Sequence, residues 1–152
     1  MLSFDWNCFT NIALDLQIDQ AVPYQDQMNQ AILRTCVSRT YYAAYNIALF
    51  HLGGVNGTNY QKAKTLLQAR PPRSSGSHEC VWFGYQRASI PMARPVGTLG
   101  FQLKSKRADA DYVATIEHNS KTVTDAIRES NEILKIINRL VTSGSISSLV
   151  VR

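Results

Sequence analysis

The sequence lacks the patterns that mark several classes of enzyme and of secreted protein. Its three cysteines, Cys8, Cys36 and Cys80, are widely spaced and form no CxxC pair, so neither a zinc site nor a disulfide framework is predicted. The GxxxxGK[ST], GxGxxG, HExxH and GxSxG patterns are absent, and there are only three histidines. We therefore expect no metal and no cofactor, and we expect the cysteines to be small buried residues in a reducing compartment.

Long apolar runs are missing as well. No run approaches the ~20 residues that a membrane-spanning helix needs. The first twenty residues lack the basic start and the uninterrupted apolar stretch of a signal peptide, because Asp5, Asp15 and Asp19 interrupt them. These absences predict a cytoplasmic protein with no membrane partner. Apolar residues make up 45% of the 152 residues, which is enough for one domain with a packed core.

The apolar residues that are present recur at three- and four-residue spacing, which predicts helices. We expect helices over residues 3–19, 26–52, 59–69, 78–88 and 107–141, with an irregular stretch at 89–100 because of its prolines and glycines. The predicted fold is an all-α, up-and-down bundle of four to five helices. It occupies residues 1–141. Residues 142–152 are expected to form a flexible tail or to dock on a neighbour.

Positive charge is concentrated in the middle of the chain. The net charge is +5, and residues 62–107 hold nine basic side chains against Glu79 alone. Such a segment attracts phosphate backbones, so Lys62, Lys64 and Arg70 are candidate nucleic-acid contacts. The alternatives are an ordinary solvated surface or contact with an acidic partner protein.

Two arginines in the sequence suggest more specific chemistry. Arg73 and His78 have four residues between them, and an Arg with a His can stabilise a phosphate and move protons during RNA cleavage without a metal. Arg39 lies in an otherwise apolar stretch, where a buried charge must be paired. Asp109 and Asp111 are the candidate partners of Arg39. In the functional alternative, Arg39 or Arg107 belongs to a phosphate or nucleotide pocket.

Three segments resemble one family. Residues 38–45, Ser-Arg-Thr-Tyr-Tyr-Ala-Ala-Tyr, are similar to the SRxYYAA helix of prokaryotic HEPN domains. Residues 77–79, Ser-His-Glu, resemble the segment that opens a later helix in that family. Residues 107–112, Arg-Ala-Asp-Ala-Asp-Tyr, resemble its R-x-x-ADY element. The residues of these segments expected in a structural polar network are Ser38, Tyr41, Tyr42, Asp109, Asp111 and Tyr112.

The resemblance implies a helical bundle that forms a homodimer. Many HEPN proteins are metal-independent ribonucleases of toxin–antitoxin or defence systems, with an Arg-x4–6-His motif. Carried over to this chain, Arg73 stabilises the scissile phosphate and His78 is the general acid or base. The alternative is a non-catalytic HEPN module that binds nucleic acid, a nucleotide or a cognate protein. An antitoxin or a nucleotidyltransferase is the expected protein partner.

Overall fold

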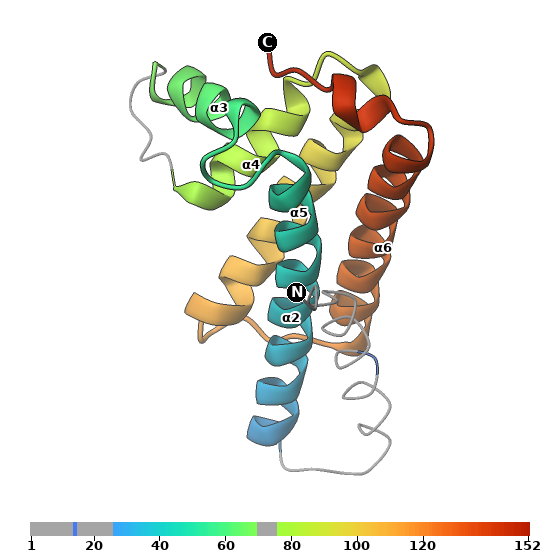
Figure 1. Ribbon diagram of the computed structural model, residues 1–152. Helices are drawn as coiled ribbons and strands as arrows, with labels where there is room; N and C mark the ends of the chain where they lie inside the picture. The colour runs from blue at the N-terminus through green and yellow to red at the C-terminus, as the bar shows by residue number, and fades with distance from the viewer. Residues whose placement is uncertain (1–13, 15–25, 70–75) are drawn as a thin grey trace, which may run out of the picture.

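The computed structural model describes residue 14, residues 26–69 and residues 76–152 of the chain. Within these residues all the regular secondary structure is helical and no strand occurs, so the predicted all-α class is confirmed. The expected helix at residues 3–19 lies outside the described residues apart from Leu14. The elements in chain order are α2 (Asp26–His51), α3 (Thr58–Gln68), α4 (Ser77–Gln86), the 3-10 turn η2 (Pro91–Ala93), α5 (Arg94–Tyr112), α6 (Ser120–Thr142) and η3 (Ser145–Ser148) (Figure 1).

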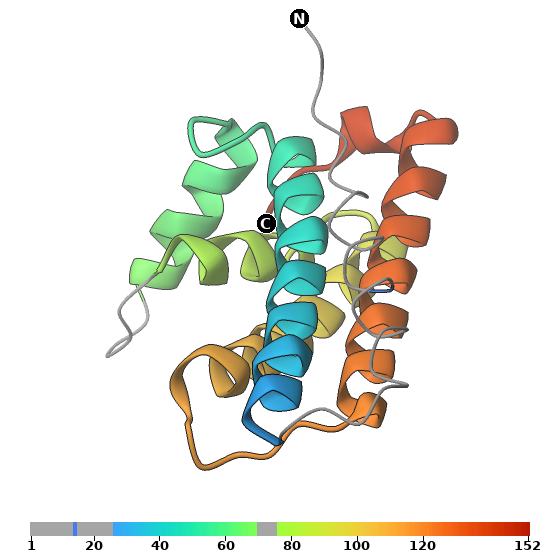
Figure 2. The same ribbon diagram turned by 90° about the horizontal axis from the view of Figure 1, so that it is seen from below.

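Three long helices make the body of the molecule. Helices α2, α5 and α6 pack against one another in pairs, and α5 runs in the opposite direction to the other two (Figure 1). The shorter helices α3 and α4 pack together and project to one side of this body, with α4 against α5 (Figures 1 and 2). The core lies where these elements meet, and its largest fully buried side chains include Trp82, Tyr41 and Tyr85.

Helix α2 is central in the bundle, as its apolar pattern predicts. Cys36, Val37 and Ala44 are fully buried on two adjoining faces of the helix, because α5 and α6 cover it from different sides. Since α2 spans Asp26–His51, the expected range of 26–52 is confirmed to within one residue. Phe50 departs from the pattern, since it is 73% exposed near the end of the helix.

The prediction of an irregular stretch at residues 89–100 is wrong from Arg94 onward. Helix α5 begins at Arg94, with Pro95 in its first turn, where a missing N–H costs nothing. Gly97 and Gly100 continue the helix because Trp82 of α4 lies against them. A Cβ atom at Gly97 would come within 2.5 Å of the Trp82 carbonyl oxygen, and one at Gly100 within 2.1 Å of the Trp82 ring. These glycines permit close packing of two helices and do not mark a loop.

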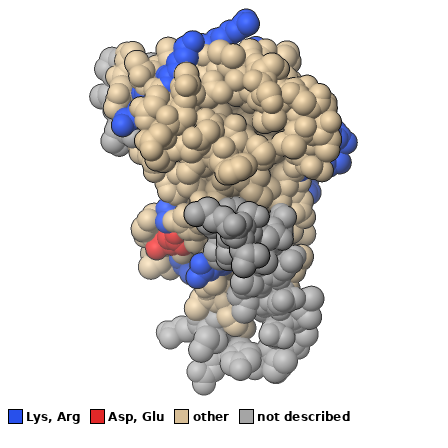
Figure 3. Space-filling model, in the orientation of Figure 1, with Lys and Arg blue, Asp and Glu red and all other residues tan. Residues whose placement is uncertain are grey.

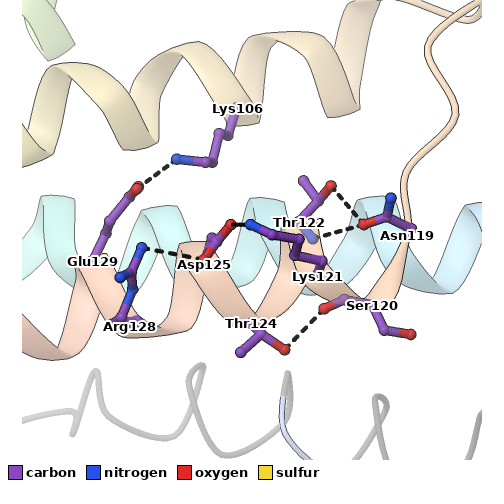
Figure 4. A network of polar contacts seen from close by, with 9 residues as sticks. All are labelled: Lys106, Asn119, Ser120, Lys121, Thr122, Thr124, Asp125, Arg128 and Glu129. Atoms are coloured by element: carbon purple, nitrogen blue, oxygen red, sulfur yellow. Dashed lines mark hydrogen bonds and ion pairs between the residues drawn. The ribbon is translucent and has the colours of Figure 1, made fainter.

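The expected single helix over residues 107–141 is also wrong, because the structure divides it. Helix α5 ends at Tyr112, a connection follows, and α6 begins at Ser120. The Asn119 side chain caps α6 by accepting a hydrogen bond from the Thr122 backbone N–H at 2.9 Å (Figure 4). Asp109 and Asp111 therefore lie in the last turns of α5, and they do not open the final helix.

Side chains of α2 hold the connection between α5 and α6. The Arg34 guanidinium donates to five backbone carbonyl oxygens, of residues 109, 110, 113, 114 and 116, at 2.6–3.4 Å. A cation at this place suits the negative end of the α5 dipole. The Gln30 amide pairs with both backbone groups of His118, at 2.8 and 2.9 Å. The connection is thus fixed against α2 by polar contacts.

The C-terminal residues pack on the domain itself. Leu149 and Val151 are buried, and Val151 forms an isolated antiparallel bridge with Ala88. The Asn59 side chain of α3 donates to the Leu149 carbonyl at 2.8 Å and accepts from the Val151 N–H at 3.0 Å. The prediction of a flexible tail did not anticipate these contacts.

Candidate functional site

The three segments that resemble HEPN sequences meet in one side-chain cluster. Tyr41 and Tyr42 come from the middle of α2, His78 from the first turn of α4, and Arg107 from the last turns of α5. Tyr42 lies between Arg107 and His78. Its hydroxyl accepts a hydrogen bond from Arg107, and its ring contacts the His78 ring edge to face, with 5.9 Å between the centroids. We call these four residues, together with Tyr45, the His78 cluster.

A chain of hydrogen bonds fixes the His78 imidazole. The indole Nε1–H of Trp82 donates to the Tyr41 hydroxyl oxygen at 3.2 Å, and that hydroxyl lies 2.6 Å from His78 Nδ1. Since Tyr41 is fully buried, its own hydrogen needs an acceptor, and Nδ1 is the acceptor beside it. This network assigns Nδ1 as an acceptor and places the proton of the neutral ring on Nε2. Among the described residues, none forms a hydrogen bond with Nε2.

The surroundings of His78 favour the neutral ring. The imidazole stacks on the Tyr45 ring with 4.1 Å between centroids and 9° between planes. Burial lowers the pKa of His78 below its usual value, and the positive charges of Arg107 and Lys104 lower it further. The imidazole is therefore neutral at pH 7 in the free protein, and it presents an N–H donor at Nε2.

Arg107 is held between two aromatic rings and a carboxylate. Its Nη2 donates to the Tyr42 hydroxyl at 2.8 Å, and its Nε forms an ion pair with Asp111 at 2.6 Å. The guanidinium carbon lies 5.3 Å from the Tyr42 ring centroid and 4.9 Å from that of Tyr112. Such stacking is typical of arginines that recognise planar or anionic groups.

The basic segment is partly neutralised once the chain has folded. Lys104 pairs with Glu79 of α4 at 2.7 Å, and Lys106 reaches across from α5 to Glu129 of α6 at 2.5 Å (Figure 4). With the Arg107–Asp111 pair, three of its cations have carboxylate partners. In the orientation of Figure 3, Lys and Arg side chains lie at several separate places, with no single large patch on the face shown. The three ion pairs reduce the charge that this segment presents after folding.

The remaining predicted residues are not gathered at the cluster. Arg70 and Arg73 lie outside the described residues. On α3, Lys62 is exposed and Lys64 is half-buried. Arg39 is exposed, so the expectation of a buried charge at this position is wrong. Its place on α2 points it away from the packed faces, whereas Asp111 pairs with Arg107.

Trp82 and Lys104 belong to the site but were not singled out from the sequence. Trp82 follows His78 by four residues on α4, and Lys104 precedes Arg107 by three residues on α5. Residues at these spacings share a helix face, so the spacing was the available signal. It could not be used for Lys104, because the α5 helix itself was not predicted there.

A groove of about 590 Å³ opens beside the cluster. It lies between the start of α2, the end of α5 and the connection that follows. Tyr112, which is 71% exposed, forms part of its wall. Its lining also includes Ala31, Arg34, Ala110, Asp111, Ile116 and Glu117.

Two classes of site find no support in the described part of the chain. No group of three or more His, Cys, Asp or Glu side chains there is arranged to hold a metal ion. Cys36 and Cys80 are buried free thiols, as predicted, and burial raises the pKa of Cys36 to about 11; Cys8 lies outside the described residues. None of the described helices combines the length and apolar character needed to cross a membrane.

Comparisons with known proteins add nothing to this geometry. No family model, no curated protein and no solved structure matches the chain. The site must therefore be interpreted from its own side chains.

Proposed function

We propose that this chain is a HEPN-like helical protein that acts on RNA by binding its phosphate backbone at the His78 cluster. The observation that carries the proposal is that all three HEPN-like segments contribute to this one cluster. His78 offers an N–H donor at Nε2, and Arg107 offers a guanidinium stacked between two tyrosine rings. Both are groups that bind phosphate oxygens.

The protonation of His78 favours binding over general-base catalysis. A ring whose Nδ1 accepts from Tyr41 carries its proton on Nε2, so that nitrogen has no lone pair for a 2′-hydroxyl proton. A bound phosphate stabilises the imidazolium form, because an opposite charge raises the pKa of a histidine. We therefore expect RNA affinity to rise as the pH falls toward the pKa of His78, which burial holds below its usual value.

Metal-independent RNA cleavage is the second candidate. It is favoured by the Arg73–His78 spacing and by the lack of a hydrogen bond from any described residue to Nε2 of His78. In this reading, Arg73 stabilises the scissile phosphate. His78 becomes the general acid after the bound phosphate has promoted its protonation.

One experiment tests both functions. Wild type, His78→Ala, His78→Gln and Arg73→Ala are titrated with a fluorescent RNA and incubated with the same RNA in EDTA. For binding, we expect His78→Ala to lose about 3- to 10-fold in affinity. We expect His78→Gln, which keeps an N–H donor, to bind well but without the rise at acidic pH. Lys135→Ala, on the solvated face of α6, is the matched control.

The outcomes separate the two functions. Equal affinity of wild type and His78→Ala, or no RNA binding at all, would overturn the proposal. Cleavage by wild type that is lost in His78→Ala, His78→Gln and Arg73→Ala would establish the nuclease. Equal traces of cleavage in every variant would indicate contamination and would remove that candidate.

We also propose that the protein forms a homodimer, with an antitoxin or a nucleotidyltransferase as its cognate partner. These proposals rest on the HEPN resemblance. Light scattering of the purified protein tests the dimer. Inspection of the neighbouring genes tests the partner.

A further inference from the structure

We infer that Tyr112 is a stacking platform for an unpaired nucleobase, so that the ligand is single-stranded RNA. This inference rests on the proposed function and specifies its substrate class. It places one base in the groove beside Tyr112 and the adjoining phosphate at the His78 cluster.

The exposure of Tyr112 is the first observation. It is the last residue of α5, is 71% exposed and forms part of the groove wall, so its ring is accessible from solvent beside the groove. The Arg107 guanidinium lies 4.9 Å from its ring centroid and supports one side of it. A guanidinium beneath an exposed ring pre-organises a flat surface for a further planar group.

The groove has the chemistry of a base site. Ala31, Ala110 and Ile116 supply apolar contacts, and the volume of about 590 Å³ is ample for a nucleoside. The carboxylates of Asp111 and Glu117 also line it, and they repel a phosphate but accept hydrogen bonds from the N–H groups on a base edge.

Arg34 is the one Lys or Arg among the described residues that line the groove, and it is not available to an anion. Both Nη atoms of Arg34 are engaged by backbone carbonyl oxygens. The groove therefore favours a neutral planar group, and phosphate is favoured at the other side of Tyr112.

Arg107 connects these two places. It contacts Tyr42 of the His78 cluster on one side and Tyr112 on the other. A nucleotide whose base covers Tyr112 can thus place its phosphate at Arg107, on the side of the His78 cluster. Bases in a duplex are paired and stacked with each other, so only an unpaired base can do this.

The test uses a 12-nucleotide single-stranded RNA of mixed sequence and a duplex made from the same strand. Affinities are measured for wild type, Tyr112→Ala and Tyr112→Phe. Phe50→Ala is the matched control, because Phe50 is similarly exposed, at 73%, but lies near the end of α2, whereas the start of α2 lines the groove. A single strand carrying 5-iodouridine is also photo-crosslinked, and the modified residue is identified by mass spectrometry.

We expect Tyr112→Ala to bind the single strand about 10-fold more weakly, while Tyr112→Phe and Phe50→Ala keep wild-type affinity. We expect the crosslink at Tyr112. Unchanged affinity in Tyr112→Ala with a crosslink elsewhere would overturn the stacking inference and leave RNA binding intact. Absence of RNA binding by wild type would instead overturn the proposed function itself. Tighter binding of the duplex than of the strand would also refute the inference.

Discussion

At the scale of single residues, Arg34 is the charged side chain that joins α2 to the end of α5 and to the connection that follows. Its five carbonyl contacts gather the end of α5 and the connection to α6 around one guanidinium. They also shape the groove beside Tyr112, since residues 110, 114 and 116 line it. This arginine therefore links the stability of the bundle to the geometry of the candidate site.

We predict that Arg34→Ala lowers the free energy of unfolding by about 2–3 kcal/mol, because charged hydrogen bonds are lost and carbonyl groups are left without donors. Arg34→Lys should lose less, since it keeps the charge but lacks the planar fork. Urea denaturation of both variants measures the effect. Arg139→Ala, an exposed arginine in the last turn of α6, should change stability by under about 0.5 kcal/mol. A loss at Arg34 as small as at Arg139 would contradict the capping role.

The sequence selected Arg39 as the arginine of α2 that pairs with the end of α5, whereas Arg34 makes the contacts there that the structure describes. The two residues are five positions apart and therefore face different sides of the helix. Residues 113–116 cover the side of α2 that carries Arg34, and they lie about eighty positions from Arg34 in the sequence. Local sequence around α2 therefore does not show which side they cover. The sequence singled out His78, Tyr42 and Arg107, whereas their mutual contacts required the folded chain.

At the scale of elements, the helices defined by apolar spacing were predicted well and those shaped by close packing were not. Helices α2 and α3 match their expected ranges within two residues at each end. Helix α5 was missed because glycine and proline normally end helices. Here Gly97 and Gly100 are required by Trp82, which lies on a different helix, so local composition could not reveal the reason.

The C-terminal segment gives a prediction at the same scale. Val151 is fully buried beside α3 and α4, whereas its neighbour Val150 is 47% exposed. We predict that Val151→Ala costs about 1–2 kcal/mol of stability, through lost apolar burial and a small cavity. Val150→Ala should cost under about 0.5 kcal/mol and serves as the control. Thermal unfolding of the two variants measures the difference. Equal melting temperatures would show that residues 149–152 do not pack as described.

At the scale of the whole molecule, all three histidines have a lowered pKa in the folded chain, so they have the same effect on the pH dependence of stability. Burial lowers the pKa of His51, His78 and His118, and the charge of Arg34 lowers that of His118 further. A histidine with a lowered pKa binds its proton more weakly in the folded chain than in the unfolded chain. The stabilisation that it provides is complete above the unfolded pKa of about 6.5 and is lost as the pH falls below that value.

We therefore predict that the free energy of unfolding falls between pH 7 and pH 5. His118 is only 4% exposed, so it should contribute clearly, with a limit of about 1.4 kcal/mol per pH unit for one proton. His118→Gln should flatten the dependence, and Val150→Ala should leave it unchanged. Urea denaturation at several pH values measures the slope. A wild-type slope of zero in this range, or an unchanged slope in His118→Gln, would refute the assignment.

Two amide side chains hold segments that are far apart along the chain. Gln30 pairs with His118 across 88 positions, and Asn59 pairs with Val151 across 92. Closing loops of this length is slow and entropically costly, so we expect these contacts to form after the helices have assembled. Contacts that are absent from the folding transition state leave the folding rate unchanged and slow unfolding. We therefore expect these two amides to prolong the lifetime of the folded chain and to have little effect on how quickly it forms.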